Sequence, residues 1–381
     1  MSTSRSARKS PGFGQPLRLI VRLILIGIGL GVLSGSLLRA LAPQVRQQQL
    51  ALPGWIKDQP WLSELIPEQT APAQSEPERT TTASSNGIPL ARFNPRDNIT
   101  ALSERWAGLA ATQPDLKVSA FMHVLDTGSY ADFNGNQPMA AASSIKTPIL
   151  LSALELIDRQ ELQWNEPLTL TKELVGGGAG WMASRPLGSR FPTYEVATEM
   201  IRVSDNSATN LLIDRVGGQD AINLRFQELG LLSTEVNNWL PDLDGTNTTS
   251  ARDLSRSIAL VDSGETLGPR TRDLFREVMA TSVTNTLLPT GLMRGLGGAQ
   301  GAPDDSLARK GYRVLNKTGD IGIAYADAGL IELPDGTRAV AGFMVEGPFN
   351  DPRSTELIRS LAAAMAPYLK PQPAPPKPAA P

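Results

Sequence analysis

The order of predicted elements between about residues 98 and 369 most constrains the fold. Strand-like runs stand near both ends of this segment, at 118–125, 313–317, 328–332 and 338–345. Helical patterns lie between the strand-like runs or close the segment, at 147–157, 194–203, 208–216, 219–229, 250–260 and 354–368. Short reversals such as Leu333-Pro334-Asp335-Gly336 favour antiparallel pairing. We therefore predict an α/β fold of the α+β kind, in which both chain ends build an antiparallel sheet with packed helices and an all-helical subdomain.

The N-terminal region predicts a membrane anchor. Residues 1–18 are basic with no acidic residue, and within the segment 19–42 the apolar span from Leu19 to Leu38 approaches the ~20 residues that cross a bilayer. Arg22 lies near the edge of this segment, where its side chain can reach the interface. By the positive-inside rule, 1–18 is a cytoplasmic tail, 19–42 a transmembrane signal anchor, and the rest of the chain lies on the extracytoplasmic (periplasmic) side.

The segments that flank the folded domain differ from it in composition. Ala40-Leu41-Ala42 has the form of a signal-peptidase site, but Pro43 is expected to obstruct cleavage, so an uncleaved anchor is preferred over a cleaved one. Residues 43–97 are rich in Pro, Gln and Ser and predict a disordered linker, and residues 370–381 form a Pro/Ala-rich tail. The folded domain is predicted to span 98–369 and to be monomeric.

Composition excludes several kinds of chemistry. The chain has no cysteine, so it can form neither a thiolate nucleophile nor a zinc site built on sulfur. Its single histidine, His123, lies in a strand-like run and is read as a strand residue, which excludes a metal centre rich in histidine. The net charge is −2 without a long Lys/Arg cluster, so nucleic acid is not a predicted partner. We predict no metal and no cofactor.

The run Ser143-Ser144-Ile145-Lys146 opens an apolar helical pattern. Residues at i and i+3 share a helix face, so the Lys146 amine can lie beside the Ser143 hydroxyl. Burial lowers the pKa of a lysine, which makes a neutral amine available to take the serine proton. Pro148 suits the first turn of a helix and keeps Ser143 near the helix N-terminus, where developing negative charge is stabilised.

Two further motifs each have a plain structural explanation when taken alone. Ser204-Asp205-Asn206 precedes a helical pattern and can serve as an N-cap. Lys317-Thr318-Gly319 ends a strand, where a solvated lysine is ordinary. A Ser-x-x-Lys pattern is also weak by itself, because the basic tail contains one at Ser6-Ala7-Arg8-Lys9.

Together, in this order, the three motifs resemble those of class A β-lactamases and penicillin-binding proteins. Ser204 follows Ser143 by 61 residues and Lys317 follows Asn206 by 111, which is similar to class A spacing with a modest insertion before the last motif. The surrounding runs V-L-D-T-G-S and D-A-G-L are similar too. The resemblance covers about 98–369 and implies the β-lactamase/transpeptidase-like fold.

The resemblance also implies the role of each motif residue. Ser143 is the implied nucleophile, Lys146 its proton partner, and Ser204 the shuttle of a proton to the leaving nitrogen. Substrate binding is implied for Asn206, Lys317, Thr318 and Gly319. The backbone N–H groups of Ser143 and Asp320 are the implied oxyanion hole.

The sequence departs from the class A pattern at two positions. The stretch from Thr234 to Asp244 matches the family's Ω-loop pattern without a gap and places Leu240 where the family has the glutamate that activates water for deacylation. Leucine cannot accept a proton, so either Asp242, Asp244 or Glu235 replaces the base, or the acyl-enzyme is long-lived. The strand arginine that often assists carboxylate binding is also missing, and Tyr325 takes its place if the segment is one residue shorter.

Three functions remain open at this stage. The first is a membrane-anchored serine acyl-transfer hydrolase resembling class A β-lactamases, which acts on β-lactams or related amides and deacylates weakly. The second is a D-Ala-D-Ala peptidase, penicillin-binding or esterase-like enzyme, whose substrate is of the peptidoglycan type. The third is a non-catalytic cell-envelope binding protein, although a scaffold has no physical need for a serine flanked by two lysines.

Overall fold

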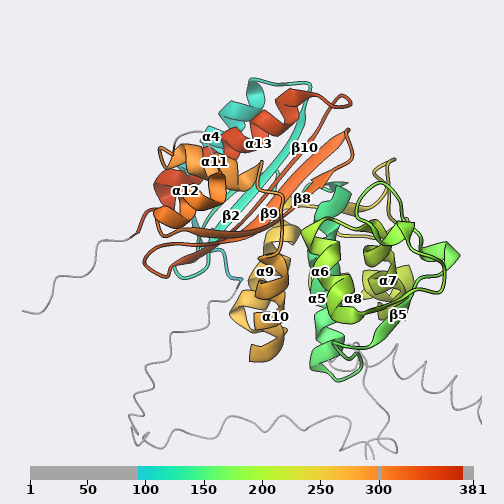
Figure 1. Ribbon diagram of the computed structural model, residues 1–381. Coiled ribbons are helices and arrows are strands. Elements are labelled where there is room, and N and C mark those ends of the chain that lie inside the picture. The colour runs from blue at the N-terminus through green and yellow to red at the C-terminus, as the bar shows by residue number, and fades with distance from the viewer. Residues whose placement is uncertain (1–92, 299–301, 372–381) are drawn as a thin grey trace, which may run out of the picture. The chain divides into compact units, whose positions relative to one another are not determined.

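A six-stranded sheet organises the part of the chain that the computed structural model describes, residues 93–298 and 302–371 (Figure 1). Its strand order is β1-β3-β2-β10-β9-β8. All pairs are antiparallel except the short β1–β3 pair. The strands are β1 Asp97–Asn98, β2 Lys117–Val124, β3 Ser129–Phe133, β8 Arg313–Asp320, β9 Ala324–Glu332 and β10 Arg338–Glu346; the short pairs are β4 Met139–Ala140 with β7 Thr248–Thr249, and β5 Pro167–Thr169 with β6 Arg190–Pro192.

The sheet joins the two ends of the domain. Strand β2 pairs with β10 in a register that sets Met122 against Ala341, and β10 pairs with β9 on its other side. The antiparallel sheet predicted from both ends of the domain is therefore confirmed. Strand β8, which carries the Lys-Thr-Gly motif, pairs only with β9 in the sheet and lies at its edge.

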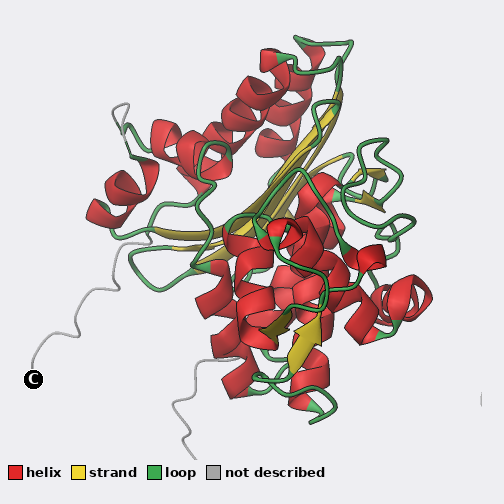
Figure 2. Cartoon of the chain, turned by 45° about the vertical axis from the view of Figure 1, so that its right-hand side comes forward, coloured by secondary structure: helices red, strands yellow, loops and turns green. Residues whose placement is uncertain are grey.

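Helices cover both faces of the sheet (Figures 1 and 2). Alternate residues of β10 point to opposite faces, so Ala341 and Phe343 join the apolar cluster under α4 and α13, whereas Val340 and Met344 join the cluster that contains α9 and α5. The helices are α4 Thr100–Ala111, α5 Lys146–Asp158, α6 Thr193–Arg202, α7 Asn206–Val216, α8 Gly218–Glu228, α9 Ala251–Ser263, α10 Pro269–Met279, α11 Leu288–Gly295, α12 Pro303–Arg309 and α13 Pro352–Met365, with 3₁₀ turns η1 Ala142–Ile145, η2 Lys172–Leu174, η3 Met182–Ser184 and η4 Ala366–Tyr368.

Helix α5 is the central helix of the second, helical layer. It is buried from Lys146 to Glu155, as its nearly uninterrupted apolar sequence requires. It contacts α7 and α9, and α6, α8 and α10 also pack against it. The first residue of α5 is Lys146, so this packing places Lys146 at the junction of the sheet and the helical layer.

Several elements differ from the sequence prediction. Helices α4, α10, α11 and α12 and strand β3 were not predicted, and α12 lies in the insertion before the last motif. Strand β8 continues through the Lys-Thr-Gly motif to Asp320, and β9 begins at Ala324 rather than Ala328. The longer strands follow from the tight turn between them, which leaves room for every residue from Arg313 to Asp320 to pair.

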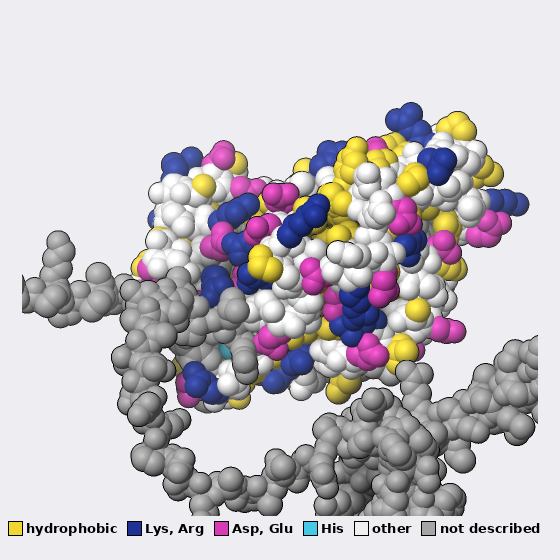
Figure 3. All heavy atoms as spheres, turned by 90° about the horizontal axis from the view of Figure 1, so that it is seen from below, with side chains coloured by type: hydrophobic (Ala, Val, Ile, Leu, Met, Phe, Trp, Pro, Cys, Tyr) yellow, Lys and Arg dark blue, Asp and Glu magenta, His cyan; other side chains and the backbone are white. Residues whose placement is uncertain are grey.

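The predicted tail at 1–18, the anchor at 19–42 and most of the linker at 43–97 lie outside the described residues, as does most of 370–381. Within the described residues, no helix has the length and apolar character needed to cross a bilayer. On the face drawn in Figure 3, lysine and arginine side chains alternate with acidic ones. That face therefore carries charges of both signs.

Candidate active site

Ser143 lies in the short turn η1, which runs directly into α5. The residue before it, Ala142, has a φ of 46°, a left-handed conformation that is uncommon for a residue with a side chain. The Ser144 hydroxyl donates to Ala141 O at 2.6 Å and helps to hold the turn. Ser143 is therefore set at the start of a helix by a locally strained turn, with its side chain only partly buried.

The Lys146 side chain is 0% exposed and its amine has four oxygen neighbours. Two are carbonyl oxygens, Ser204 O at 2.7 Å and Asn206 Oδ1 at 2.8 Å, which can only accept. The other two are hydroxyls, Ser143 Oγ and Ser204 Oγ, each at 3.0 Å. A neutral amine that donates its two N–H groups to the two carbonyl oxygens would keep its lone pair to accept a proton from one of the hydroxyls. This geometry lets the amine take a proton from Ser143.

Ser204 lies in the loop before α7, and Asn206 is the first residue of α7. Ser204 has a φ of 61°, which turns its hydroxyl toward the two lysines. Asp205 is the N-cap: its Oδ1 accepts from Ala208 N at 3.0 Å, while its Oδ2 accepts from backbone N–H groups of the adjoining loop. The Ser-Asp-Asn motif therefore both caps α7, through Asp205, and contacts Lys146, through Ser204 and Asn206.

Strand β8 brings the third motif to the same place. Lys317, 0% exposed, donates to Ser204 Oγ at 3.1 Å and to Thr318 O at 2.7 Å. Gly319 lies against the nucleophile turn, where an added Cβ would be 2.9 Å from Ser143 N and 2.8 Å from Ser144 N. Only glycine permits this approach. Asp320 follows at the exposed end of the strand, next to the turn.

Burial sets the charge state of the two lysines. The pKa of Lys146 is held well below its usual value by desolvation, then by repulsion from Lys317, and is raised only by the Asp205 carboxylate. Desolvation also lowers the pKa of Lys317 to about 8, which the Asp327 carboxylate opposes. Burial thus lowers the pKa of both lysines, and Lys146 is additionally affected by the charge of Lys317.

The Ω-loop segment packs directly behind Asn206. Asn210, one turn further along α7, accepts from Leu240 N at 2.9 Å and donates to Leu240 O at 2.8 Å. Gly176 fits between this segment and α7, since an added Cβ would lie 2.4 Å from Leu240 O and 2.9 Å from Asn206 Cβ. Leu240 is 4% exposed and belongs to the apolar cluster of the helical layer.

The three acidic residues considered as substitutes lie in different settings. Asp242 is buried, and its carboxylate accepts from Thr246 Oγ1 at 2.8 Å and from Asn247 N at 2.7 Å. These bonds close the Ω-loop turn. Asp244 and Glu235 are exposed, and Glu235 pairs through its backbone with Thr248.

On β9, the residue directly across from Thr318 is Asp327, whereas Tyr325 lies opposite Asp320 and donates its hydroxyl to Asn350 Oδ1 at 3.3 Å. The sequence reasoning did not single out Asp327 or Asn210 as site residues. Asp327 lies in the quoted run D-A-G-L and Asn210 in the helix predicted at 208–216, where its i, i+4 spacing from Asn206 was the available signal. The register that places Asp327 depends on the turn length, which the sequence pattern left open.

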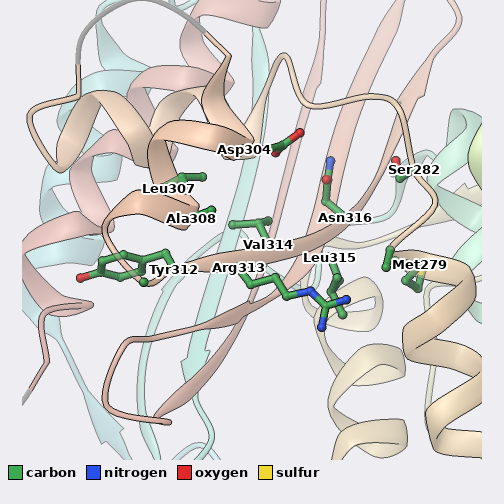
Figure 4. Close-up of a pocket in the computed structure, with 12 residues that line it drawn as sticks. Met279, Ser282, Asp304, Leu307, Ala308, Tyr312, Arg313, Val314, Leu315 and Asn316 are labelled. Carbon is green, nitrogen blue, oxygen red and sulfur yellow. The ribbon is translucent and has the colours of Figure 1, made fainter.

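A pocket of about 480 Å³ lies along the first half of β8 (Figure 4). The end of α10, helix α12 and residues 311–316 line it. Asn316 links this pocket to the motif, because it lines the pocket and directly precedes Lys317. Its Nδ2 also donates to Thr284 O at 2.9 Å, which ties β8 to the loop after α10.

Comparisons with known proteins agree with this geometry. A sequence model described as the Beta-lactamase enzyme family matches residues 101–369. A β-lactamase of Streptomyces cellulosae is 24% identical over 268 residues, which cover 67% of this chain and 81% of that protein. The solved structure of PBP-A is 39% identical, with a TM-score of 0.66 over 72% of this chain and 98% of that one. A leucine-to-glutamate variant of PBP-A, solved as an acyl-enzyme complex with penicillin G, has the same identity, coverage and TM-score.

The family match spans well over half of the chain, and the mixed fold agrees with it. The chain belongs to the β-lactamase enzyme family and is a β-lactamase-like serine hydrolase.

Proposed function

We propose that the chain is an active-site serine acyl-transfer hydrolase that reacts with β-lactams or related amides, forms an acyl-enzyme on Ser143 and releases it slowly. The observation that carries this proposal is the position of the Lys146 amine, 3.0 Å from the hydroxyls of both Ser143 and Ser204. Lys317, 3.1 Å from Ser204 Oγ, extends the chain of polar contacts. No cofactor takes part in the proposed steps.

Acylation follows from these contacts. Ser143 Oγ forms a bond to the carbonyl carbon of the substrate while its proton passes to the neutral Lys146 amine. The carbonyl oxygen gains negative charge, which the N–H groups of Ser143 and Asp320 stabilise. The C–N bond then breaks as Ser204 Oγ gives its proton to the leaving nitrogen and regains one from Lys146. The product is an ester of Ser143.

Substrate binding is assigned to four groups around this centre. Asn206 contacts the substrate amide and also holds Lys146 through its Oδ1 at 2.8 Å. Lys317, a buried cation, and Thr318, the next residue along the edge strand, are the groups proposed to bind the substrate carboxylate. Gly319 keeps the edge of β8 free of a side chain next to Ser143.

Slow deacylation follows from Leu240. Release of the acyl group needs a base to activate water, and the segment held by Asn210 presents leucine where the family has glutamate. Asp242 already accepts two bonds within its own turn, and Asp244 and Glu235 are exposed. Without a base, turnover should fall by ~10²–10⁴.

A second candidate, a D-Ala-D-Ala peptidase or penicillin-binding enzyme, is favoured by the 39% identity to PBP-A over 98% of that chain. The same groups would acylate Ser143 with a peptidoglycan-type peptide. We also propose that the segment 19–42 anchors a monomeric catalytic domain on the periplasmic side of a membrane, as the sequence pattern predicts.

One experiment separates these candidates. The protein is incubated with a fluorescent penicillin and a chromogenic cephalosporin, and labelling and colour are followed together. We expect stable labelling of Ser143 with little colour, and Ser143→Ala should abolish the label. Rapid colour would contradict slow deacylation, and the absence of both signals would leave a non-catalytic envelope protein. Hydrolysis of a D-Ala-D-Ala peptide would select the peptidase.

A further inference from the structure

Asp327 is a buried acid that the proposed reaction does not use. It is 0% exposed and lies in the middle of β9, between strands β8 and β10. Its carboxylate accepts from Asn316 Nδ2 at 2.9 and 3.1 Å and from Leu288 N at 2.9 Å. Both donors are uncharged amides. A carboxylate removed from water in this way is unfavourable unless an opposite charge lies nearby.

Lys317 is the matching buried cation. It is also 0% exposed, and its two hydrogen bonds go to uncharged oxygens, Ser204 Oγ and Thr318 O. In the β8–β9 register, Lys317 pairs with Ala328 and is thus one position away from Asp327. Because cross-strand partners share a face, Asp327 lies on the face of Thr318, and Lys317 points to the opposite one. The Asp327 carboxylate acts on the pKa of Lys317 through the sheet, without a direct hydrogen bond between them.

We propose that Asp327 is a positioning residue for the reaction: buried behind the edge strand, its carboxylate holds Lys317 as a cation, which in turn binds the substrate carboxylate and orients Ser204. This inference rests on the proposed function of Lys317. Asp327 would then contribute to the recognition of anionic substrates indirectly, through the charge of Lys317.

The charged groups around Lys317 have opposing effects. The charge of Lys317 lowers the pKa of Lys146, at the start of α5, and Asp205, at the N-cap of α7, raises the pKa of Lys146. Asp320 lies at the exposed end of β8 itself. Asp327 is the carboxylate that raises the pKa of Lys317, against the larger lowering by desolvation, to give about 8. Burial raises the pKa of Asp327 to about 7, which its hydrogen bonds and Lys317 oppose. Between these two values both groups are mostly ionised.

The test uses the full chain in detergent, with Asp327→Asn as the main variant. The double variant Asn316→Asp/Asp327→Asn returns a carboxylate to the neighbouring strand, and Asp253→Asn, at the start of α9, controls for loss of a buried acid elsewhere. Acylation rates are measured against pH with benzylpenicillin and with its methyl ester, which has no carboxylate. The pKa of Lys317 is measured directly by NMR of ¹³C-labelled lysine, assigned with Lys317→Arg.

We expect Asp327→Asn to lower the pKa of Lys317 and to move the alkaline fall in acylation by benzylpenicillin roughly one pH unit lower, equivalent to about a tenfold loss where Lys317 becomes neutral. The methyl ester should lose less, the double variant should recover, and Asp253→Asn should leave the ratio of the two substrates unchanged. An unchanged Lys317 pKa in Asp327→Asn, or equal losses for both substrates, would overturn the proposal.

Two outcomes are kept distinct by the NMR measurement. If benzylpenicillin does not acylate the wild type, the proposed function fails, while the Lys317 pKa in Asp327→Asn still decides the part of Asp327. If Asp327→Asn does not fold, the wild type is titrated alone. Lys317 must then be a cation at neutral pH, and a neutral Lys317 there would refute its pairing with Asp327.

Discussion

Lys146 and Lys317 have the same side chain, yet their surroundings affect their pKa values differently. The Lys146 amine donates hydrogen bonds to two carbonyl oxygens, and the charge of Lys317 lowers its pKa. Lys317 has a carboxylate across the sheet. Titratable groups whose environments separate their pKa values can divide the work of base and cation between them.

This division predicts the pH dependence of acylation. The rate should rise as pH passes the lowered pKa of Lys146, because the amine must lose its proton before it can act as a base. The rate should fall as pH passes about 8, because Lys317 then loses the charge that binds the substrate carboxylate. Labelling rates with a fluorescent penicillin across this range measure both limbs. In Lys317→Arg, whose guanidinium stays charged, the alkaline fall should vanish; its persistence would contradict this assignment.

A second prediction concerns the side chain of Leu240 and the rate at which the acyl group is released. Leu240→Glu should speed loss of the penicillin label by ~10²–10⁴, because the segment would regain a general base near the acyl bond. Leu243→Glu is the matched control, since Leu243 is in the same segment but 66% exposed. The release rate of the label is measured after removal of free penicillin. An unchanged rate in Leu240→Glu would show that this position does not face the ester.

At the level of elements, the site depends on the end of β8 lying against the turn η1. Gly319 allows this contact, with Ser143 N and Ser144 N within 3 Å of where a Cβ would stand. The contact joins the sheet to the helical layer at Ser143, the proposed nucleophile. Any displacement of the strand would therefore separate Asp320 from Ser143, the two residues whose N–H groups form the proposed oxyanion hole.

Gly319→Ala should therefore slow acylation, by up to ~10²-fold for a displacement near 1 Å. The reason is geometric, since the methyl group would push β8 away from backbone atoms that cannot move freely. Gly108→Ala, in α4, is the control, because a Cβ there would meet nothing within 4 Å. Labelling rate and thermal stability are compared for both variants. Wild-type labelling by Gly319→Ala would disprove the need for close contact.

The sequence predicted the elements whose burial leaves a periodic or continuous apolar pattern, including β2, β10 and α5. Helix α11 was missed because Pro289 and two glycines weaken its intrinsic preference, and packing against α13 stabilises it instead. The three motifs predicted the residues that meet around Lys146. Asp327 was not predicted as a site residue, because its place opposite Thr318 depends on a turn length that the sequence pattern did not settle.

At the scale of the whole chain, the predicted anchor can be tested by fractionation. If 19–42 forms the predicted anchor, the full chain should remain with membranes after an alkaline wash. A chain that begins at residue 43 should be released into the supernatant and should still label with penicillin. Release of the full chain by the same wash would contradict an uncleaved anchor.

Strand β10 lies between β2 and β9, although it is the last strand in the sequence. During synthesis, β2 and β3 therefore emerge more than two hundred residues before the strand that must complete their sheet. The central pairing cannot form until residue 346 has left the ribosome. Such distant pairing is slow. The nascent chain therefore lacks its finished sheet until translation is nearly complete.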